Sequence, residues 1–294
     1  MPPDGSGTRE AEASSGAARS LVSGKLDLEF AADADGRTYL RRQYAGYPFN
    51  VCRALYQDRD HPGLATLYVQ SCSGGIYEGD RLDVTLATAQ GAEAHVSTQA
   101  ATVVHSMPSG SASQRVRLQC EGGSYLEYLP DPQILFPSSR YRSEIAVRLG
   151  GDAVALVSDS FLTHDPAGGG DMFASYFSEI VVDNETGKVL AIDRLKVDGQ
   201  AFRDSCPGIS GRFAAQGTMI VAGLDLADDV AGELQKVRLD RDVAAIGSSQ
   251  LPNSAGLLVR VLAADGAALK LALHQVWCAA RLALKGSLPV ERRK

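Results

Sequence analysis

The feature that most limits the fold of this chain is a period of two in hydrophobicity from Ser23 to about Ile192. Successive side chains of a strand point to opposite faces, so a period of two indicates a β-strand with one buried face. Turn-forming residues separate most of these short runs. We therefore predict an all-β body, layered or solenoidal, with no helical segment between its strands. The runs lie at 26–30, 65–70, 82–86, 93–98, 116–120, 124–129, 144–149, 153–158, 178–183 and 188–192.

The pattern changes near Gly217, where helical spacing of apolar residues joins the strand pattern. Asp228 is expected to cap one helix, and Asp265 a second helix that Gly286 ends. Further strands are expected at 218–222 and 256–263. The predicted organisation is a disordered tail over 1–22, a β-rich body over 23–216, an α+β portion packed on it over 217–287, and a tail over 288–294.

Composition excludes several classes of function. The net charge of −6 and the scatter of the basic residues argue against a nucleic-acid-binding face. No apolar run approaches the roughly 18 residues of a transmembrane helix, and the first residues lack the apolar core of a secretion signal. The five cysteines are odd in number and widely spaced, which is typical of reduced thiols. We therefore expect a cytoplasmic protein that binds neither membranes nor nucleic acid.

One glycine-rich stretch, Gly74 to Asp80, presents two carboxylates at the start of a predicted strand. It is no phosphate-binding loop, because Asp80-Arg81 stands where such a loop needs Lys-Ser/Thr. Two interpretations remain open. Glycines with positive φ would make the stretch a simple turn, whereas Glu78 and Asp80 could hold or guide a divalent cation weakly.

A third carboxylate, Asp159, lies inside the apolar run 153–162, where an unpaired charge is costly. It is either a paired or strand-end residue, or a carboxylate that lines an internal path. The five histidines form no zinc motif, and the chain has no G-x-S-x-G element for nucleophilic catalysis. The residues therefore point to no tight metal site and no tightly bound cofactor.

Several segments, in order, resemble the urease accessory protein UreD (UreH) family from about Gly24 to Gly286. The most specific are the hallmark with double Gly and Gly-Asp at 74–80 and the TQAAT segment at 98–102. The others are Gly24–Leu26, Arg37–Leu40, Gly46–Phe49, Arg53–Tyr56, Leu126–Pro132 with Phe136, Leu258–Val261 and Val276–Arg281.

The resemblance implies stacked β-sheets in a β-helix-like arrangement with two C-terminal helices, and a non-catalytic role. Members of the family bind apo-urease and the partner UreF, which recruits the GTPase UreG. Their assembly is thought to pass Ni²⁺ through an internal acidic channel, so nickel would be a transient passenger. On the matching positions, Asp80 and Asp159 would be channel carboxylates, with Glu78 a lesser candidate.

Two stretches depart from the family pattern. Ser71–Ser73 replaces a usual Pro-Pro, and Thr163–Asp171 lacks the usual Gly-Arg and Gly-Glu. They keep a divergent relative that serves another partner as one alternative. The other is a β-solenoid-like carbohydrate hydrolase, which would use two of the three carboxylates as acid and base across an open cleft.

Overall fold

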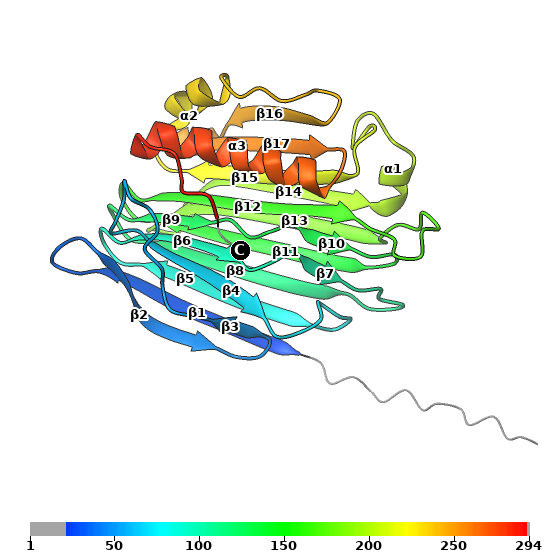
Figure 1. The fold of residues 1–294 in the computed structure, drawn as a ribbon, viewed down its shortest axis with the longest axis horizontal. Helices are drawn as coiled ribbons and strands as arrows, with labels where there is room; N and C mark the ends of the chain where they lie inside the picture. The colour runs from blue at the N-terminus through cyan, green and yellow to red at the C-terminus, as the bar shows by residue number, and fades with distance from the viewer. Residues whose placement is uncertain (1–21, 293–294) are drawn as a thin grey trace, which may run out of the picture.

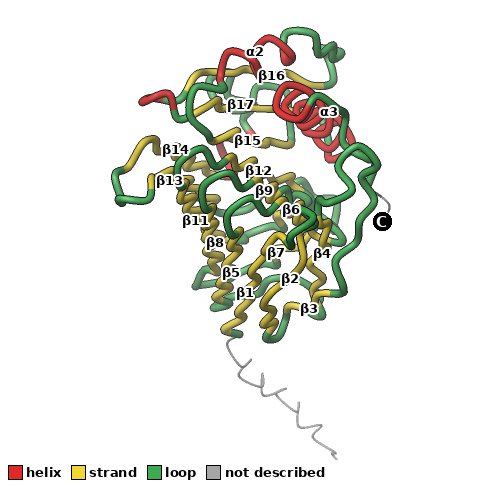
Figure 2. Tube along the Cα trace, turned by 90° about the vertical axis from the view of Figure 1, so that its left-hand side faces the viewer, coloured by secondary structure: helices red, strands yellow, loops and turns green. Residues whose placement is uncertain are grey.

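The computed structural model describes residues 22–292, which form two β-sheets packed face to face (Figures 1 and 2). Sheet A contains, in spatial order, β14 (Val189–Asp198), β13 (Ser175–Asn184), β11 (Arg140–Leu149), β8 (Ala112–Cys120), β5 (Arg81–Thr88), β1 (Ser23–Ala32) and β2 (Thr38–Ala45). Sheet B contains β16 (Ala244–Gln250), β17 (Gly256–Ala263), β15 (Ala215–Ala222), β12 (Val154–Thr163), β9 (Tyr125–Tyr128), β6 (Glu93–Thr98), β4 (Ala65–Ser71) and β3 (Phe49–Val51), with β10 (Gln133–Leu135) beside β12 and β7 (Thr102–Val104) beside β10. The predicted mainly β fold of stacked sheets is confirmed.

The sheets are wound as a solenoid in which each coil adds one parallel strand to sheet B and then one to sheet A. Turns from sheet A to sheet B are short, and Gly91 and Gly123 adopt positive φ of 70° and 71° in two of them. The connections from sheet B to sheet A are longer and lie together at the opposite end of the sandwich. We call this the long-loop end, and its four connections are 72–80, 99–111, 129–139 and 164–174.

Parallel pairing places equivalent residues of successive coils side by side, so the core is built in rows. One row of sheet A is entirely apolar and faces sheet B: Leu26, Val84, Val116, Ile145 and Ile180. The next row toward the short turns is also apolar: Leu28, Leu86, Leu118, Val147 and Val182. These rows hold the two sheets together by burial of apolar surface.

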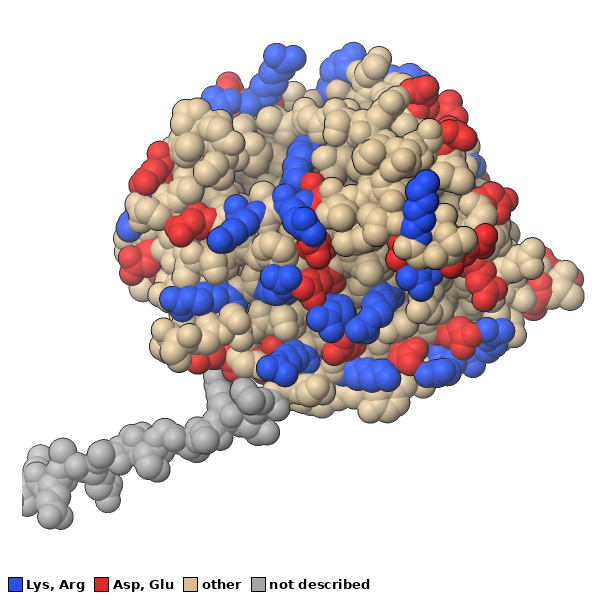
Figure 3. Space-filling view, turned by 180° about the vertical axis from the view of Figure 1, so that it is seen from behind, with Lys and Arg blue, Asp and Glu red and all other residues tan. Residues whose placement is uncertain are grey.

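The outer face of sheet A is charged and uncovered, as Figure 3 shows from behind. Parallel sheets usually have both faces buried. Here the opposite charges alternate from strand to strand and form ion pairs, for example Arg115 with Glu144 at 3.1 Å and Arg148 with Asp183 at 2.8 Å. This pattern explains why the strands of sheet A show such clear alternation in the sequence.

The far side of sheet B is covered by α2 (Ala227–Leu234) and α3 (Gly266–Lys285), and α3 lies in front of the sheet in Figure 1. Asp265 caps α3 by accepting a hydrogen bond from the Ala268 amide at 2.8 Å, and Gly286 ends the helix with a φ of 72°, both as predicted. The predicted cap at Asp228 is wrong. Leu226 occupies the cap position, and Asp228 lies in the first turn, where its carboxylate accepts a hydrogen bond from Gln250.

The remaining helical segments are α1 (Gly199–Arg203) and the 3₁₀ turn η1 (Pro252–Ser254). Strands β15, β17 and β16 continue sheet B in antiparallel fashion beyond β12. The division at 216/217 into a body and an α+β portion stays a prediction, and the predicted tails lie outside the described residues for 1–21 and 293–294. None of the described helices is long and apolar enough to cross a membrane.

We expect Leu118→Ala to lower the free energy of unfolding by about 2–5 kcal/mol, because it opens a cavity between the sheets. The control Leu288→Ala alters a side chain that is 58% exposed and should change it by less than about 0.5 kcal/mol. Denaturant unfolding followed by circular dichroism measures both. Equal midpoints for the two variants would contradict the assignment of this row to the core.

Candidate functional site

Toward the long-loop end, the inner face of sheet A changes from apolar to polar. The row next to the apolar core contains Gln114, Ser143 and Ser178. The following row contains Ala112, Tyr141 and Tyr176. Asp80 precedes β5 beside this second row, where its carbonyl accepts a hydrogen bond from the Ser113 amide. The interior therefore combines a dry half with a half that contains polar side chains.

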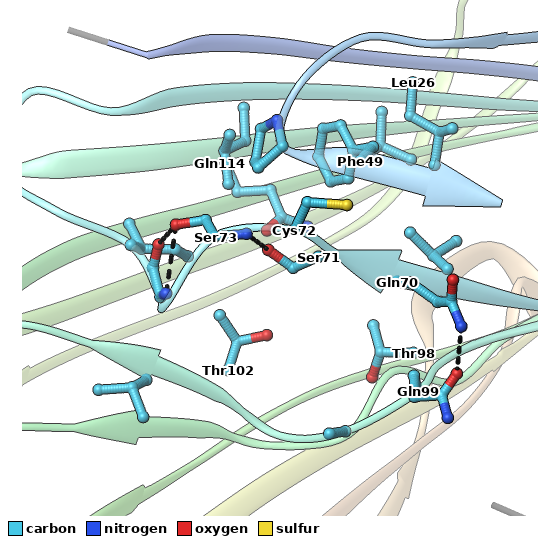
Figure 4. Close-up of a pocket in the computed structure, with 18 of the residues that line it drawn as sticks. Leu26, Phe49, Gln70, Ser71, Cys72, Ser73, Thr98, Gln99, Thr102 and Gln114 are labelled. Atoms are coloured by element: carbon cyan, nitrogen blue, oxygen red, sulfur yellow. Dashed lines mark hydrogen bonds between the residues drawn. The ribbon is translucent and has the colours of Figure 1, made fainter. Parts of the chain in front are cut away.

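A cavity of about 430 Å³ enters this polar half from the long-loop end (Figure 4). Exposed Ser71 and Cys72 lie at its rim, and Thr98 and Thr102 line the opposite wall. Three polar side chains contribute to its lining from deeper positions: Asp80, Gln114 and Tyr128. Both sequence hallmarks, the double-glycine stretch and the TQAAT segment, thus form walls of one cavity.

Asp80 is 6% exposed, and backbone amides hold its carboxylate. Oδ2 accepts a hydrogen bond from the Tyr77 amide at 2.9 Å, and Oδ1 accepts one from the Val22 amide at 3.4 Å. Each oxygen has two lone pairs, so both retain capacity for a further ligand. The carboxylate is therefore fixed at the cavity without a charged partner among its hydrogen bonds.

Glu78 lies elsewhere. Its carboxylate is turned toward loop 99–111, where it accepts hydrogen bonds from the Ser109 hydroxyl at 2.9 Å and the Ser109 amide at 3.3 Å. These hydrogen bonds hold the pKa of Glu78 below its ordinary value. Glu78 does not line the cavity, and Gly79, with a φ of 86°, separates its direction from that of Asp80.

Asp159 lies on β12 between the sheets and is 5% exposed. Its carboxylate accepts hydrogen bonds from the Tyr176 hydroxyl at 2.8 Å and from the Ser178 hydroxyl. Burial raises the pKa of Asp159, and the hydroxyl donors offset only part of this effect. Within residues 22–292, no Lys, Arg or His side chain forms an ion pair with this carboxylate, so its negative charge is stabilised by neutral hydrogen-bond donors.

Gln114 connects the cavity with the surroundings of Asp159. Its amide nitrogen donates to the Tyr128 hydroxyl at 3.3 Å, and its amide oxygen accepts from the Tyr141 hydroxyl at 3.1 Å. The Tyr141 ring in turn packs on Tyr176, with 6.1 Å between ring centroids, and Tyr176 donates to Asp159. We call the series Asp80, Gln114, Tyr141, Tyr176 and Asp159 the polar run. Asp80 and Asp159 lie at its two ends and do not face each other.

A second set of buried charges fixes α3 to sheet B. Glu127, fully buried, accepts hydrogen bonds from Arg281 at 2.9 Å, from His95 at 2.6 Å and from Trp277 at 2.9 Å. Burial alone would raise the pKa of Glu127, but the His95 hydrogen bond and the Arg281 guanidinium hold it well below its usual range. Arg281 also donates to Asp58 at 2.8 Å.

Nothing in the described residues suggests a tight metal centre, since no group of three or more His, Cys, Asp or Glu side chains there could hold an ion. The three candidate carboxylates therefore take three separate positions: Asp80 at the cavity, Asp159 in the interior and Glu78 against a loop. Only the first two belong to the polar run.

The polar residues that connect these carboxylates were not predicted from the sequence. Extending the alternation of β8, β11 and β13 by one or two steps toward the long-loop end would have found them, because Gln114 and Tyr176 share a face with the apolar core residues. Arg281 could have been found as a charge on the apolar face of α3, which signals a buried partner.

We expect Asp159→Asn to stabilise the fold at neutral pH, because a buried carboxylate without a cation opposes folding. The folded-state pKa of Asp159 is raised, so protonation favours the folded chain, and the wild type loses this contribution as pH rises above about 4. The stability gap between variant and wild type should therefore widen between pH 4 and 7. Denaturant unfolding across this range measures it, and a constant gap would show that Asp159 titrates normally.

We expect Arg281→Met to lower the free energy of unfolding by about 3–5 kcal/mol, because Glu127 would remain buried without its cation. Lys236→Met is the control, since Lys236 pairs with Glu233 on the surface with its side chain 71% exposed. It should cost less than about 1 kcal/mol. Thermal and denaturant unfolding compare the two, and similar losses would mean that the buried network does not anchor α3.

Comparison with known proteins identifies the family of this chain. The model of the family described as UreD urease accessory protein matches residues 22–294. The protein named urease accessory protein UreD 1 of Pseudomonas syringae pv. syringae is 40% identical over 268 residues, which cover 91% of this chain and 94% of that protein.

Two further relatives come from distant organisms. The UreD 1 of Methylorubrum extorquens is 37% identical over 87% of both chains. The UreD of Haloarcula marismortui is 35% identical over 89% of this chain and 87% of its own. The family is one of non-catalytic accessory proteins, and its role is in urease maturation. With matches of this extent, the chain belongs to the UreD family of urease accessory proteins.

Proposed function

We propose that this protein delivers Ni²⁺ to apo-urease by guiding the ion through its own interior, as a scaffold in a cytoplasmic complex with UreF and UreG. The observation that supports the proposal is the polar run between the sheets. It begins at a cavity that Asp80 lines and continues through Gln114 and the tyrosines to Asp159. A chain whose task is to bind partners alone has no need for polar groups in its core, where each must be satisfied.

The chemistry of these side chains suits passage better than storage. Carboxylate, hydroxyl and amide oxygens are hard ligands, whereas Ni²⁺ binds more tightly to imidazole and thiolate. An ion at Asp80 would therefore be held by charge and loosely coordinated. It can be released toward Asp159, whose carboxylate lacks a cation of its own.

An arriving cation also changes the protonation of the path. A divalent ion near Asp159 favours the ionised carboxylate and lowers its raised pKa. Entry of Ni²⁺ thus releases the electrostatic cost of the buried charge, and departure restores it. Because the pKa of Asp159 is raised, a proton can replace the departing ion on this carboxylate, and this competition disfavours permanent occupation.

The partners in this proposal follow from the family, in which UreF recruits UreG and the complex meets apo-urease. The walls of the cavity at the long-loop end come from loops of successive coils, so a partner that covers this end would enclose the rim. Ser71, Cys72 and Gln99 are exposed at that rim, where such a partner can reach them.

A carbohydrate hydrolase fits the geometry less well. A glycosidase needs two carboxyl groups about 5–10 Å apart on an open cleft. Of the three candidates, Glu78 is bound to Ser109 outside the cavity, and Asp159 is enclosed between the sheets. No pair among them faces one cleft. The relatives are named accessory proteins of an enzyme, which agrees with this geometry.

We expect Asp80→Asn and Asp159→Asn each to leave the complex with UreF, UreG and apo-urease intact while reducing the nickel content of urease. Asp242→Asn is the matched control, because the Asp242 side chain is 84% exposed and remote from the run. Complex formation is followed by size-exclusion chromatography, and nickel in the purified urease by mass spectrometry. Full nickel loading by both single variants and by the double variant would overturn the path.

Deletion of the gene tests the wider proposal. Apo-urease should accumulate without nickel, and return of the gene should restore both nickel and activity. Urease that is fully loaded in the absence of this chain would identify it as a relative that serves another partner.

A further inference from the structure

The polar run does not end at Asp159. Thr218 on β15 lies directly opposite Asp159, and Arg260 on β17 lies directly opposite Thr218. Paired residues of neighbouring strands point to the same face, so all three side chains face the space between the sheets. Arg260 confirms this direction by donating to the Thr218 hydroxyl at 3.0 Å. A row of polar side chains thus continues across sheet B, away from the cavity.

This row ends at an ion pair between the sheets. The guanidinium of Arg260 donates to Oδ1 of Asp193, on β14 of sheet A, at 2.5 Å. Among the ion pairs of residues 22–292, it alone joins a strand of sheet A to a strand of sheet B. The Asp193 carboxylate is also close enough to Asp159 to contribute to the raised pKa of Asp159.

The position of the pair is at the side of the sandwich. β14 is the edge strand of sheet A, whereas sheet B continues past β17 to β16. The side chains of Arg260 and Asp193 are 32% and 14% exposed, so water reaches the pair from outside. Asp159, two strands inward in sheet B, is 5% exposed. The run therefore meets solvent here a second time, at a place distinct from the cavity rim.

We propose that Arg260 is a gate at a second mouth of the polar run, and that a divalent cation passes only when its guanidinium swings outward. The inference rests on the proposed function. In the closed state, the positive charge of Arg260 occupies the place beside Asp193 that a cation would need, and it repels a divalent ion. Its exposed fraction gives the guanidinium a solvated position to move to, as long basic side chains commonly adopt.

Opening leaves a chain of oxygen ligands in place. When Arg260 leaves, the carboxylates of Asp193 and Asp159 and the hydroxyl of Thr218 remain along the row. Asp193 is then a free anion at the surface, and it attracts the cation to the mouth as Arg260 is drawn away. Asp193 therefore pairs with Arg260 in the closed state and with the passing divalent cation in the open state.

The test compares Arg260→Gln with Arg194→Gln in the full complex supplied with Ni²⁺. Arg194 is the residue after Asp193 on β14, but it points outward and pairs with Glu179, so it controls for loss of an ion pair on this strand. The initial rate of nickel transfer to apo-urease should rise about tenfold in Arg260→Gln, the factor that removal of about 1.4 kcal/mol from a barrier gives. It should be unchanged in Arg194→Gln.

Arg260→Lys separates charge from shape, since it retains the positive charge and should transfer nickel at close to the wild-type rate. Arg260→Met retains the apolar stem and replaces Arg260→Gln if the latter does not fold, as judged by circular dichroism. A purely structural role predicts slower transfer, so a rate that falls or stays unchanged in the folded neutral variant overturns the gate.

The outcomes for the gate and for the proposed function are distinguishable. If Asp80→Asn slows transfer and Arg260→Gln does not speed it, the path stands and the gate is wrong. If Asp80→Asn, Asp159→Asn and their double variant all leave transfer unchanged, the path itself fails, and the gate fails with it.

Discussion

In-register stacking of the coils is the constraint on which the remainder of this structure depends. Parallel pairing aligns equivalent positions, so a choice made in one coil is repeated in its neighbours. Apolar residues such as Val116 and Ile145 share a row and close the half of the sandwich near the short turns. One step toward the long-loop end, Gln114 and Ser143 share the next inward row. A continuous polar run therefore needs only a polar residue at the equivalent strand position of each successive coil.

Two buried carboxylates differ in how their negative charge is compensated. Glu127 is matched by Arg281 and other donors, and its charge is fully compensated where α3 meets sheet B. Asp159 is equally enclosed, but only neutral hydroxyls donate to it, and its pKa is raised as a result. An uncompensated buried charge is retained at functional sites at the expense of stability. In the proposed path, the absence of a paired cation at Asp159 leaves its carboxylate available to a passing ion.

The period of two predicted most strands, because each has one face toward the core. It missed β2 and β16, whose residues are largely exposed, and the short strands β3, β7 and β10, which have only three residues each. The period of two also did not show that Gln114 points inward. A polar residue at an inward-facing position breaks the apolar alternation, so the predicted strand ends there. Glu78 and Asp80 looked equivalent in sequence, and only the turn at Gly79 separates their directions. Hydrophobic alternation in the sequence shows which side chains are buried. It does not show which polar side chains of the two sheets come into contact, and the polar run depends on those contacts.

The departures of this chain from its family begin at the last residues of β4 and β12 and continue into the loops that follow them. Ser71–Ser73 lies at the cavity rim, and residues 164–171 lie in the last long loop. Asp165 in that loop accepts hydrogen bonds from the amides of Ala167 and Asp171, so its carboxylate closes the loop on itself. A path that relied on loop carboxylates would have lost them here. Asp159 is instead fixed on β12, and Asp80 is held where its connection joins β5. The strand residue Asp193 adds a third carboxylate where the run meets solvent again. Carboxylates held by the sheets persist when the loops change, because the register that positions them is the register that holds the core together.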